Sequence, residues 1–187
     1  FVQWLYLMKS SNNATFSTYE TFIRNNSDFP RIGRLQYLAE QKIYLKNSSP
    51  KNIIRWFEEF PPVSGTGKLK LGEAYFDLKD INSSKELVKE GWINADLSKS
   101  QLRFYRKKFK SILDNEDHIK RADYLAWNRK YWDLKRMLVY LPSDFKALYN
   151  ARQILMSNSY GVDNAIAKVP DRFKKDIGLE YLSLIHI

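Results

Sequence analysis

One histidine closely follows three acidic residues, a combination of side chains that can bind a divalent metal ion. His118 comes directly after Asp117, and Glu116 and Asp114 lie just before it. Carboxylate and imidazole groups are common ligands of such cations. The same spacing is also typical of a helix N-terminus, where acidic side chains complement the helix dipole. Because the other histidine, His186, lies in the last few residues and the chain has no cysteine, we expect a structural role and predict no metal and no cofactor.

A glycine-rich stretch suggests a second kind of chemistry, the binding of phosphate. Residues 65–68 read Gly-Thr-Gly-Lys. The phosphate-binding loop of nucleotide enzymes needs a further glycine five residues before the Gly-Lys pair and a serine or threonine after it. Here those positions are Pro62 and Leu69. We therefore interpret residues 61–67 as a loop that leads into a helix.

The sequence does not define a catalytic site. Two histidines and no cysteine do not specify a nucleophilic triad. A glycosidase needs two carboxyl groups that face each other across a cleft, and the adjacent residues Glu58 and Glu59 cannot supply that geometry from one helix. We expect no catalytic residue within this chain.

The strongest candidate for a binding site is a run of basic residues. Between Ser98 and Lys110 there are six basic residues and no acidic one. Such a face can hold a polyanion, and the interleaved Phe104 and Tyr105 can stack on single-stranded nucleic acid or on sugar rings. The alternative is a solvated helix face with its aromatic residues buried. The candidate binding residues are Lys99, Arg103, Arg106, Lys107 and Lys110.

Composition limits the class of protein. With 44% hydrophobic and 28% charged residues, the 187-residue chain fits a globular protein rather than a disordered one. No apolar stretch reaches about 18 residues, so we expect no transmembrane segment. The formal net charge of +10 fits an anionic partner, or a general bias toward lysine.

The elements that would position these residues are helices. Apolar residues recur at helical spacing almost throughout, and the prolines fall between the periodic segments. Ser83 with Glu86, and Ser98 with Gln101, have the spacing of capping boxes. We predict an all-α fold of ten or eleven short helices. They form antiparallel hairpins that stack as an α-solenoid or superhelix, a degenerate relative of tetratricopeptide repeats, since residues 71–75 resemble the first helix of such a unit.

Both ends of the chain are unusual. Residues 4–8 resemble the end of a helix that has already begun, and the sequence ends on apolar residues without a helix cap. We expect a fragment in which residues 1–182 belong to one helical domain and residues 183–187 are a non-native tail.

Several stretches together resemble the superhelical, U-shaped N-terminal domain of the soluble lytic murein transglycosylases. Residues 117–127 carry that family's pattern of Asp-His, a basic residue, Arg, Leu and Trp, and residues 60–74 carry its Pro-Pro turn, Gly-x-Gly loop and leucine-rich helix. The resemblance extends from about residue 4 to residue 182, and it rests on the order and spacing of the motifs. Further similar stretches are residues 16–38, 87–92, 131–141 and 151–170.

This resemblance implies a periplasmic protein of the cell wall. It implies a non-catalytic scaffold that helps to hold the glycan strands of peptidoglycan for its own C-terminal, lysozyme-like catalytic domain. That domain would cleave bonds between N-acetylmuramic acid and N-acetylglucosamine and leave 1,6-anhydro ends. Its general acid is a glutamate followed by serine, and none of the nine glutamates here is followed by serine. We therefore expect the catalytic domain to be absent from this chain, and the positive charge to serve peptidoglycan rather than nucleic acid.

Two other functions remain open from the sequence. A tetratricopeptide-like helical scaffold would bind protein partners, and a basic helical protein would bind RNA. Both are compatible with the helical periodicity and the net charge.

Overall fold

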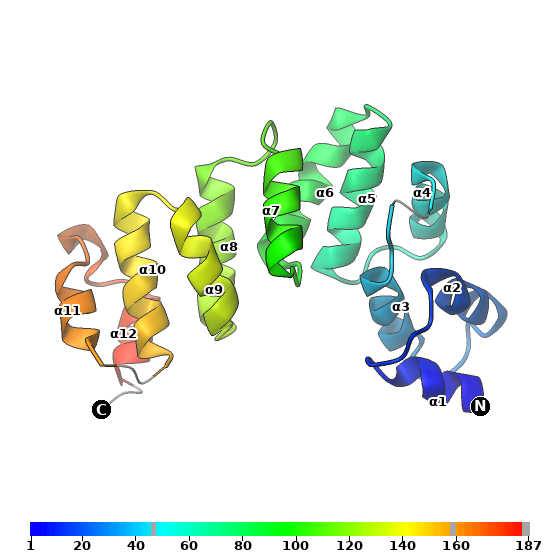
Figure 1. Cartoon of the computed structure of the whole chain (residues 1–187), viewed down its shortest axis with the longest axis horizontal. Coiled ribbons are helices and arrows are strands. Elements are labelled where there is room, and N and C mark those ends of the chain that lie inside the picture. Colours follow the sequence, from blue (N-terminus) through cyan, green and yellow to red (C-terminus); the bar gives the residue numbers. More distant parts are fainter. Residues whose placement is uncertain (46–47, 158–159, 185–187) are drawn as a thin grey trace. The chain divides into compact units, whose positions relative to one another are not determined.

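A computed structural model describes residues 1–45, 48–157 and 160–184 and divides the chain into two compact units, Phe1–Asp96 and Leu97–Ile187. Within the described residues there are twelve α-helices, two short 3-10 helices and no strand (Figure 1). The predicted all-α class of packed helical hairpins is confirmed, although short helices near both ends bring the number above the ten or eleven expected. Residues 185–187 of the expected tail lie outside the described part.

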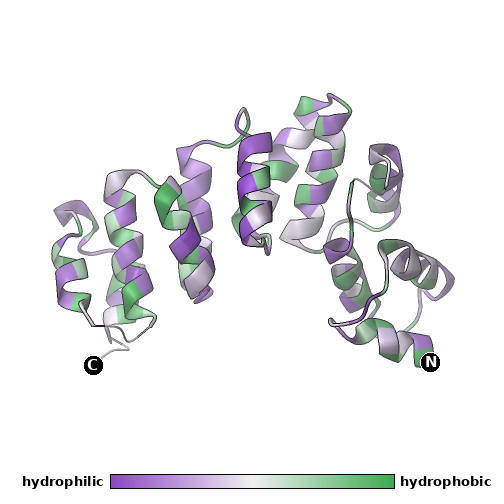
Figure 2. Ribbon diagram, viewed as in Figure 1, coloured by the Kyte–Doolittle hydropathy of each residue, from purple (hydrophilic) through white to green (hydrophobic). Residues whose placement is uncertain are grey.

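The helices of each unit follow one another through short connections. The first unit contains α1 (Val2–Met8), α2 (Phe16–Asn25), α3 (Ile32–Gln41), α4 (Pro50–Glu59), α5 (Gly65–Asp77) and α6 (Ile81–Asn94). The second contains α7 (Lys99–Lys108), α8 (Asn115–Trp127), α9 (Tyr131–Met137), η1 (Leu138–Tyr140), α10 (Ser143–Leu155), α11 (Val162–Ala167), η2 (Asp171–Phe173) and α12 (Ile177–Leu184). Figure 2 shows hydrophilic and hydrophobic residues alternating around these helices, as expected for amphipathic segments.

Side chains that accept from backbone amides begin most of the longer helices. The predicted capping box at Ser98 and Gln101 is confirmed, because each side chain accepts from the backbone of the other. The one predicted at Ser83 and Glu86 is wrong. Asp80 caps α6 instead, and its carboxylate accepts from the Ser83 amide at 3.1 Å. The chain turns out of α5 through a residue with positive φ at position 79, so α6 has already begun when it reaches Ser83.

The core of the first unit is largely aromatic. Trp56 is fully buried, and the Phe16 ring meets it edge-on with the centroids 5.4 Å apart. Tyr19 is also fully buried, and its hydroxyl donates to the Leu7 carbonyl at 2.8 Å. Asn12 donates to the same hydroxyl at 2.7 Å, so the short α1 is held to α2 by polar as well as apolar contacts.

Glycines allow α5 and α6 to pack backbone against backbone. A Cβ atom at Gly91 would lie 2.6 Å from the Leu69 nitrogen and 2.8 Å from the Gly65 carbonyl oxygen. A Cβ atom at Gly72 would lie 2.8 Å from a methyl group of Val88. Larger side chains at these positions would push the two helices apart, because the atoms in the way belong partly to backbone that cannot rotate aside.

In the second unit, the buried Arg152 interrupts the apolar stripe of α10, and its contacts explain how a charged residue is accommodated there. The residue is 1% exposed, and its guanidinium donates to Asp123 at 2.7 Å and lies 3.7 Å from Asp176. It also lies over the rings of Trp127 and Tyr149, at 5.1 and 5.3 Å from their centroids. A buried charge is tolerated when it is paired in this way, and here it joins α8, α10 and the residues just before α12.

We predict that Gly91→Ala destabilises the first unit. The added methyl group meets the α5 backbone, so the free energy of unfolding should fall by about 1–3 kcal/mol. Gly33→Ala is the matched control, since nothing lies within 4 Å of a Cβ atom there, and it should change stability by less than about 1 kcal/mol. Urea denaturation followed by circular dichroism measures both variants. Equal stabilities would show that the α5–α6 contact is looser than described.

Candidate functional site

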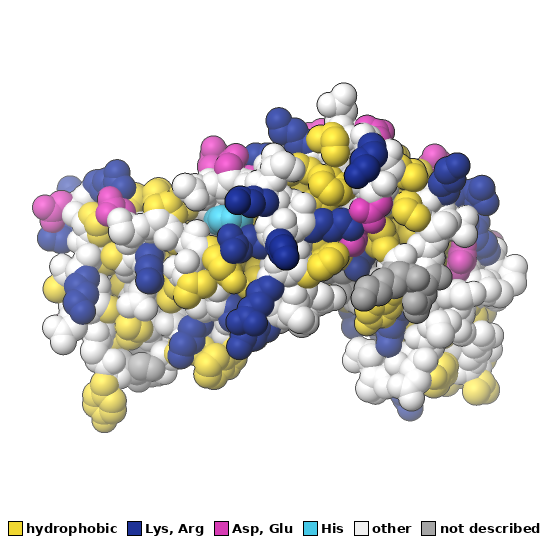
Figure 3. All heavy atoms as spheres, turned by 45° about the horizontal axis from the view of Figure 1, so that its top comes forward, with side chains coloured by type: hydrophobic (Ala, Val, Ile, Leu, Met, Phe, Trp, Pro, Cys, Tyr) yellow, Lys and Arg dark blue, Asp and Glu magenta, His cyan; other side chains and the backbone are white. Residues whose placement is uncertain are grey.

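The predicted basic residues all lie on the exposed side of α7 and of the turn that follows it. Leu102 and Tyr105 face the interior, as the helical spacing predicts. On the solvent side, none of the five candidate cations forms an ion pair with a carboxylate of the described residues. Lysine and arginine side chains surround a histidine on the surface shown in Figure 3. These five exposed candidates are Lys99, Arg103, Arg106, Lys107 and Lys110.

The two aromatic residues of α7 have different environments. Phe104 is 50% exposed, and the Lys108 ammonium lies 5.5 Å from its ring centroid. Tyr105 is buried and stacks on Phe109 with the ring centroids 5.7 Å apart. Only the Phe104 ring is therefore placed to stack on a ligand, and the expected aromatic platform is reduced to one residue.

Arg106 is the one candidate with a close aromatic partner on another element. Its guanidinium carbon lies 4.3 Å from the centroid of the Tyr140 ring in η1. The ring of the buried His118 lies 6.5 Å from the same tyrosine ring. Burial, and then the nearby Arg106 charge, lower the pKa of His118. The imidazole therefore stays neutral at neutral pH and adds no charge to the basic face.

The acidic residues before His118 have the structural role that the sequence suggested. Asp114 caps α8 and accepts from the Asp117 amide at 3.1 Å, while Asp117 accepts from the Asp114 amide at 3.0 Å. Glu116 forms an ion pair with Lys120 at 2.7 Å. In the described part of the chain, no three His, Asp or Glu side chains are grouped so that they could hold a metal ion.

The glycine-rich stretch is part of a helix, so the expectation of a loop up to residue 67 is wrong. Ser64 caps α5 by accepting from the Gly67 amide at 3.0 Å, and the helix begins at Gly65. Its N-terminus faces an anion supplied by the protein itself. The fully buried Glu40 carboxylate accepts from the Val63 amide at 2.7 Å and from the Ser64 hydroxyl. Because Gly67 has no side chain, the Glu40 carboxylate fits beside it. This carboxylate occupies the place at the helix N-terminus where a phosphate could otherwise bind.

Glu40 should make stability depend on pH. Burial raises the pKa of its carboxyl above the ordinary value of 4.5, and the hydrogen bonds from Ser64 and Val63 offset this only in part. An acid whose pKa is raised on folding contributes stability that is present below its unfolded pKa and is lost as the pH rises through its folded pKa. The stability of the wild type relative to Glu40→Gln should therefore fall as the pH rises above 4.5.

Urea denaturation over a series of pH values checks this expectation. Glu58→Gln is the control, since it removes an exposed carboxylate from α4 of the same unit. A Glu40→Gln difference that does not change with pH would contradict the raised pKa of the buried Glu40 carboxyl.

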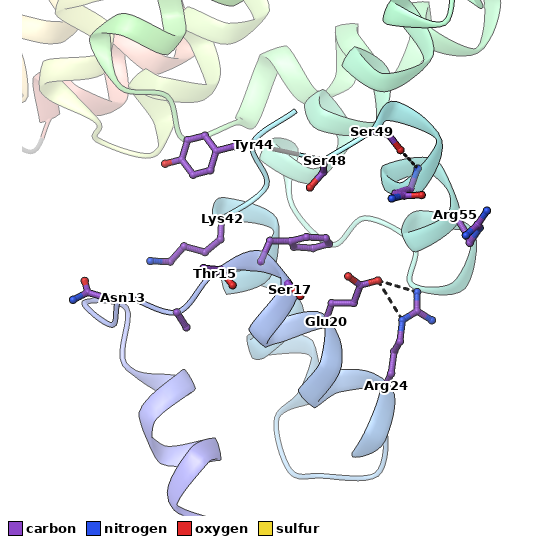
Figure 4. Close-up of a pocket in the computed structure, with 13 residues that line it drawn as sticks. Asn13, Thr15, Ser17, Glu20, Arg24, Lys42, Tyr44, Ser48, Ser49 and Arg55 are labelled. Atoms are coloured by element: carbon purple, nitrogen blue, oxygen red, sulfur yellow. Dashed lines mark hydrogen bonds and ion pairs between the residues drawn. The ribbon is translucent and has the colours of Figure 1, made fainter. Parts of the chain in front are cut away.

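A cleft in the first unit is a second candidate site, which sequence reasoning did not find. Its volume is about 890 Å³, and it lies between α2, the residues after α3, and α4. Figure 4 shows Lys42 and Tyr44 toward one end, Arg24 and Arg55 toward the other, and Ser17 between them. No sequence pattern indicated this cleft, because most of its lining residues are common polar types and they lie on three separate segments. The remaining lining residues are Asn13, Ala14, Thr15, Phe16, Glu20, Ser48, Ser49 and Asn52.

Comparison of the chain with known protein families, with curated proteins and with solved structures finds no match. Among the described helices, none combines the length and the apolar character that crossing a membrane requires.

Proposed function

We propose that this chain is a non-catalytic helical domain of a periplasmic peptidoglycan lytic transglycosylase. In this proposal it holds murein strands for a C-terminal, lysozyme-like domain that cleaves between N-acetylmuramic acid and N-acetylglucosamine to give 1,6-anhydro products. The order and spacing of the motifs along the chain support the family, and the all-α architecture of helical hairpins is compatible with it.

The observation that carries the proposal is the exposed basic face of α7. Arg103 and Lys107 are one turn apart, so their like charges repel each other. Neither has an ion pair among the described residues, so the repulsion is left for an external anion to relieve. The free carboxylates of peptidoglycan peptides supply such an anion, and the half-exposed Phe104 offers a ring beside them for a sugar.

In this proposal the catalytic glutamate lies in another part of the enzyme, since no glutamate of this chain is followed by serine. The role left for this chain is to bind and position the strand. Its exposed cations would bind weakly and with sensitivity to salt, which suits a surface along which a polymer must move.

We predict that reversing three charges of the basic face weakens binding to purified sacculi. The variant Arg103→Glu, Lys107→Glu, Lys110→Glu leaves the Arg106–Tyr140 contact intact. Each exposed charge is worth about 0.2–1 kcal/mol, so sacculus binding at low salt should weaken roughly tenfold while helicity stays unchanged. Co-sedimentation with sacculi measures the affinity.

The matched control reverses three exposed lysines elsewhere, Lys51, Lys85 and Lys168, and changes the net charge equally. It should bind almost as the wild type does. Equal losses in both variants would mean that only the overall charge matters. Tighter binding to an oligonucleotide than to sacculi, with a steeper dependence on salt, would favour nucleic acid as the partner.

A further inference from the structure

We infer that the cleft between α2, residues 42–45 and α4 binds an acidic saccharide, a hydroxyl-rich sugar unit that carries one carboxylate. The choice of a murein sugar as the ligand rests on the proposed function. The cleft lies in the first unit, whereas the basic face of α7 lies in the second, so different residues form the two sites.

The size of the cleft suits one or two sugar rings. Its volume of about 890 Å³ lies within the range of about 300–1,000 Å³ found for small-molecule sites. The lining residues extend from Asn13 and Tyr44 to Arg24 and Arg55, as Figure 4 shows, which gives the cleft a long axis. An extended ligand fits this outline better than a compact one.

The lining chemistry matches a polyol. Hydroxyl groups both donate and accept, and side-chain amides do the same, so they can pair with sugar hydroxyls and N-acetyl groups in either sense. Ser17, Ser48, Asn13 and the side-chain amide of Asn52 make no hydrogen bond with a side chain or backbone group of the described residues. Phe16 supplies an aromatic wall whose far side is fixed against the buried Trp56.

The charges in the cleft select a single carboxylate. Arg24 is already paired, since it contacts both Glu20 and Glu59. Arg55 is exposed at the edge of the cleft and has no ion pair with any described carboxylate, so it is placed to bind the anion. Lys42 donates to the Asn12 carbonyl at 2.9 Å and retains two further donors. The Glu20 carboxylate in the same wall disfavours polyphosphates and nucleic acid.

Titration calorimetry with two disaccharides tests the site. The probes are N-acetylglucosaminyl-N-acetylmuramic acid without a stem peptide, which carries one free lactyl carboxylate, and N,N′-diacetylchitobiose, which has the same neutral sugar frame without that carboxylate. The wild-type chain should bind the acidic disaccharide about fivefold more tightly than N,N′-diacetylchitobiose. No saturable binding of the acidic disaccharide, or equal binding of the two, would overturn the inference.

Variants locate the binding. Arg55→Gln should remove the preference for the acidic disaccharide, whereas Lys51→Gln, on the same helix and outside the cleft, should keep it. Ser17→Tyr places a bulky ring in the cleft from an exposed position and should abolish binding with circular dichroism unchanged. Wild-type behaviour of both Arg55→Gln and Ser17→Tyr would show that the disaccharide binds elsewhere.

The two proposals fail in distinguishable ways. The variant reversed at Arg103, Lys107 and Lys110 should bind the acidic disaccharide as the wild type does. If sacculi bind through α7 but the disaccharide does not bind, only the cleft is misassigned. If the disaccharide binds and the α7 reversal leaves sacculus binding unchanged, the proposed function fails while the cleft remains an acidic-saccharide site.

Discussion

A helix of about ten residues is only marginally stable by itself, and it persists in water when a neighbour covers its apolar stripe. Most helices of this chain are of that length or shorter, so each depends on contacts with the next. The close approach of neighbouring helices is therefore the constraint that the rest of the structure must satisfy. Gly91 meets it by allowing backbone contact between α5 and α6, and Arg152 meets it by joining α8, α10 and the start of α12 through paired charge.

The protein treats its buried and exposed charges differently. Glu40 and Arg152 are buried, and each has partners supplied by other segments of its own unit. Arg103 and Lys107 on the solvent side of α7 form no ion pair with a described carboxylate, although one nearby would relieve their mutual repulsion. Internal charge stabilises contacts between helices, whereas we propose that the exposed α7 charges bind a partner. This contrast is the physical basis for assigning function to α7.

Local patterns were predictable from the sequence, and contacts between distant residues were not. The Ser98 capping box and the burial of Leu102 on α7 follow from spacing within one or two turns. The start of α5 at Gly65 depends in addition on Glu40, a carboxylate from another helix that no local pattern reveals. The cleft of the first unit was missed for the same reason, because three segments that are separate in sequence form it. Arg152 could be recognised from the sequence as a charged residue in the apolar stripe of α10, but its ion-pair partners could not be predicted.

The central proposal is that the basic face of α7 contacts peptidoglycan directly, and lysine acylation read by mass spectrometry tests it most directly. The full chain is labelled with and without an excess of purified sacculi, and the modification rate of each lysine is compared. Lys51 and Lys168, both exposed and outside the α7 sequence, serve as internal references. The account predicts slower modification of Lys99, Lys107 and Lys110 with sacculi and unchanged rates at the references. Equal rates at all five lysines in the two conditions would contradict it.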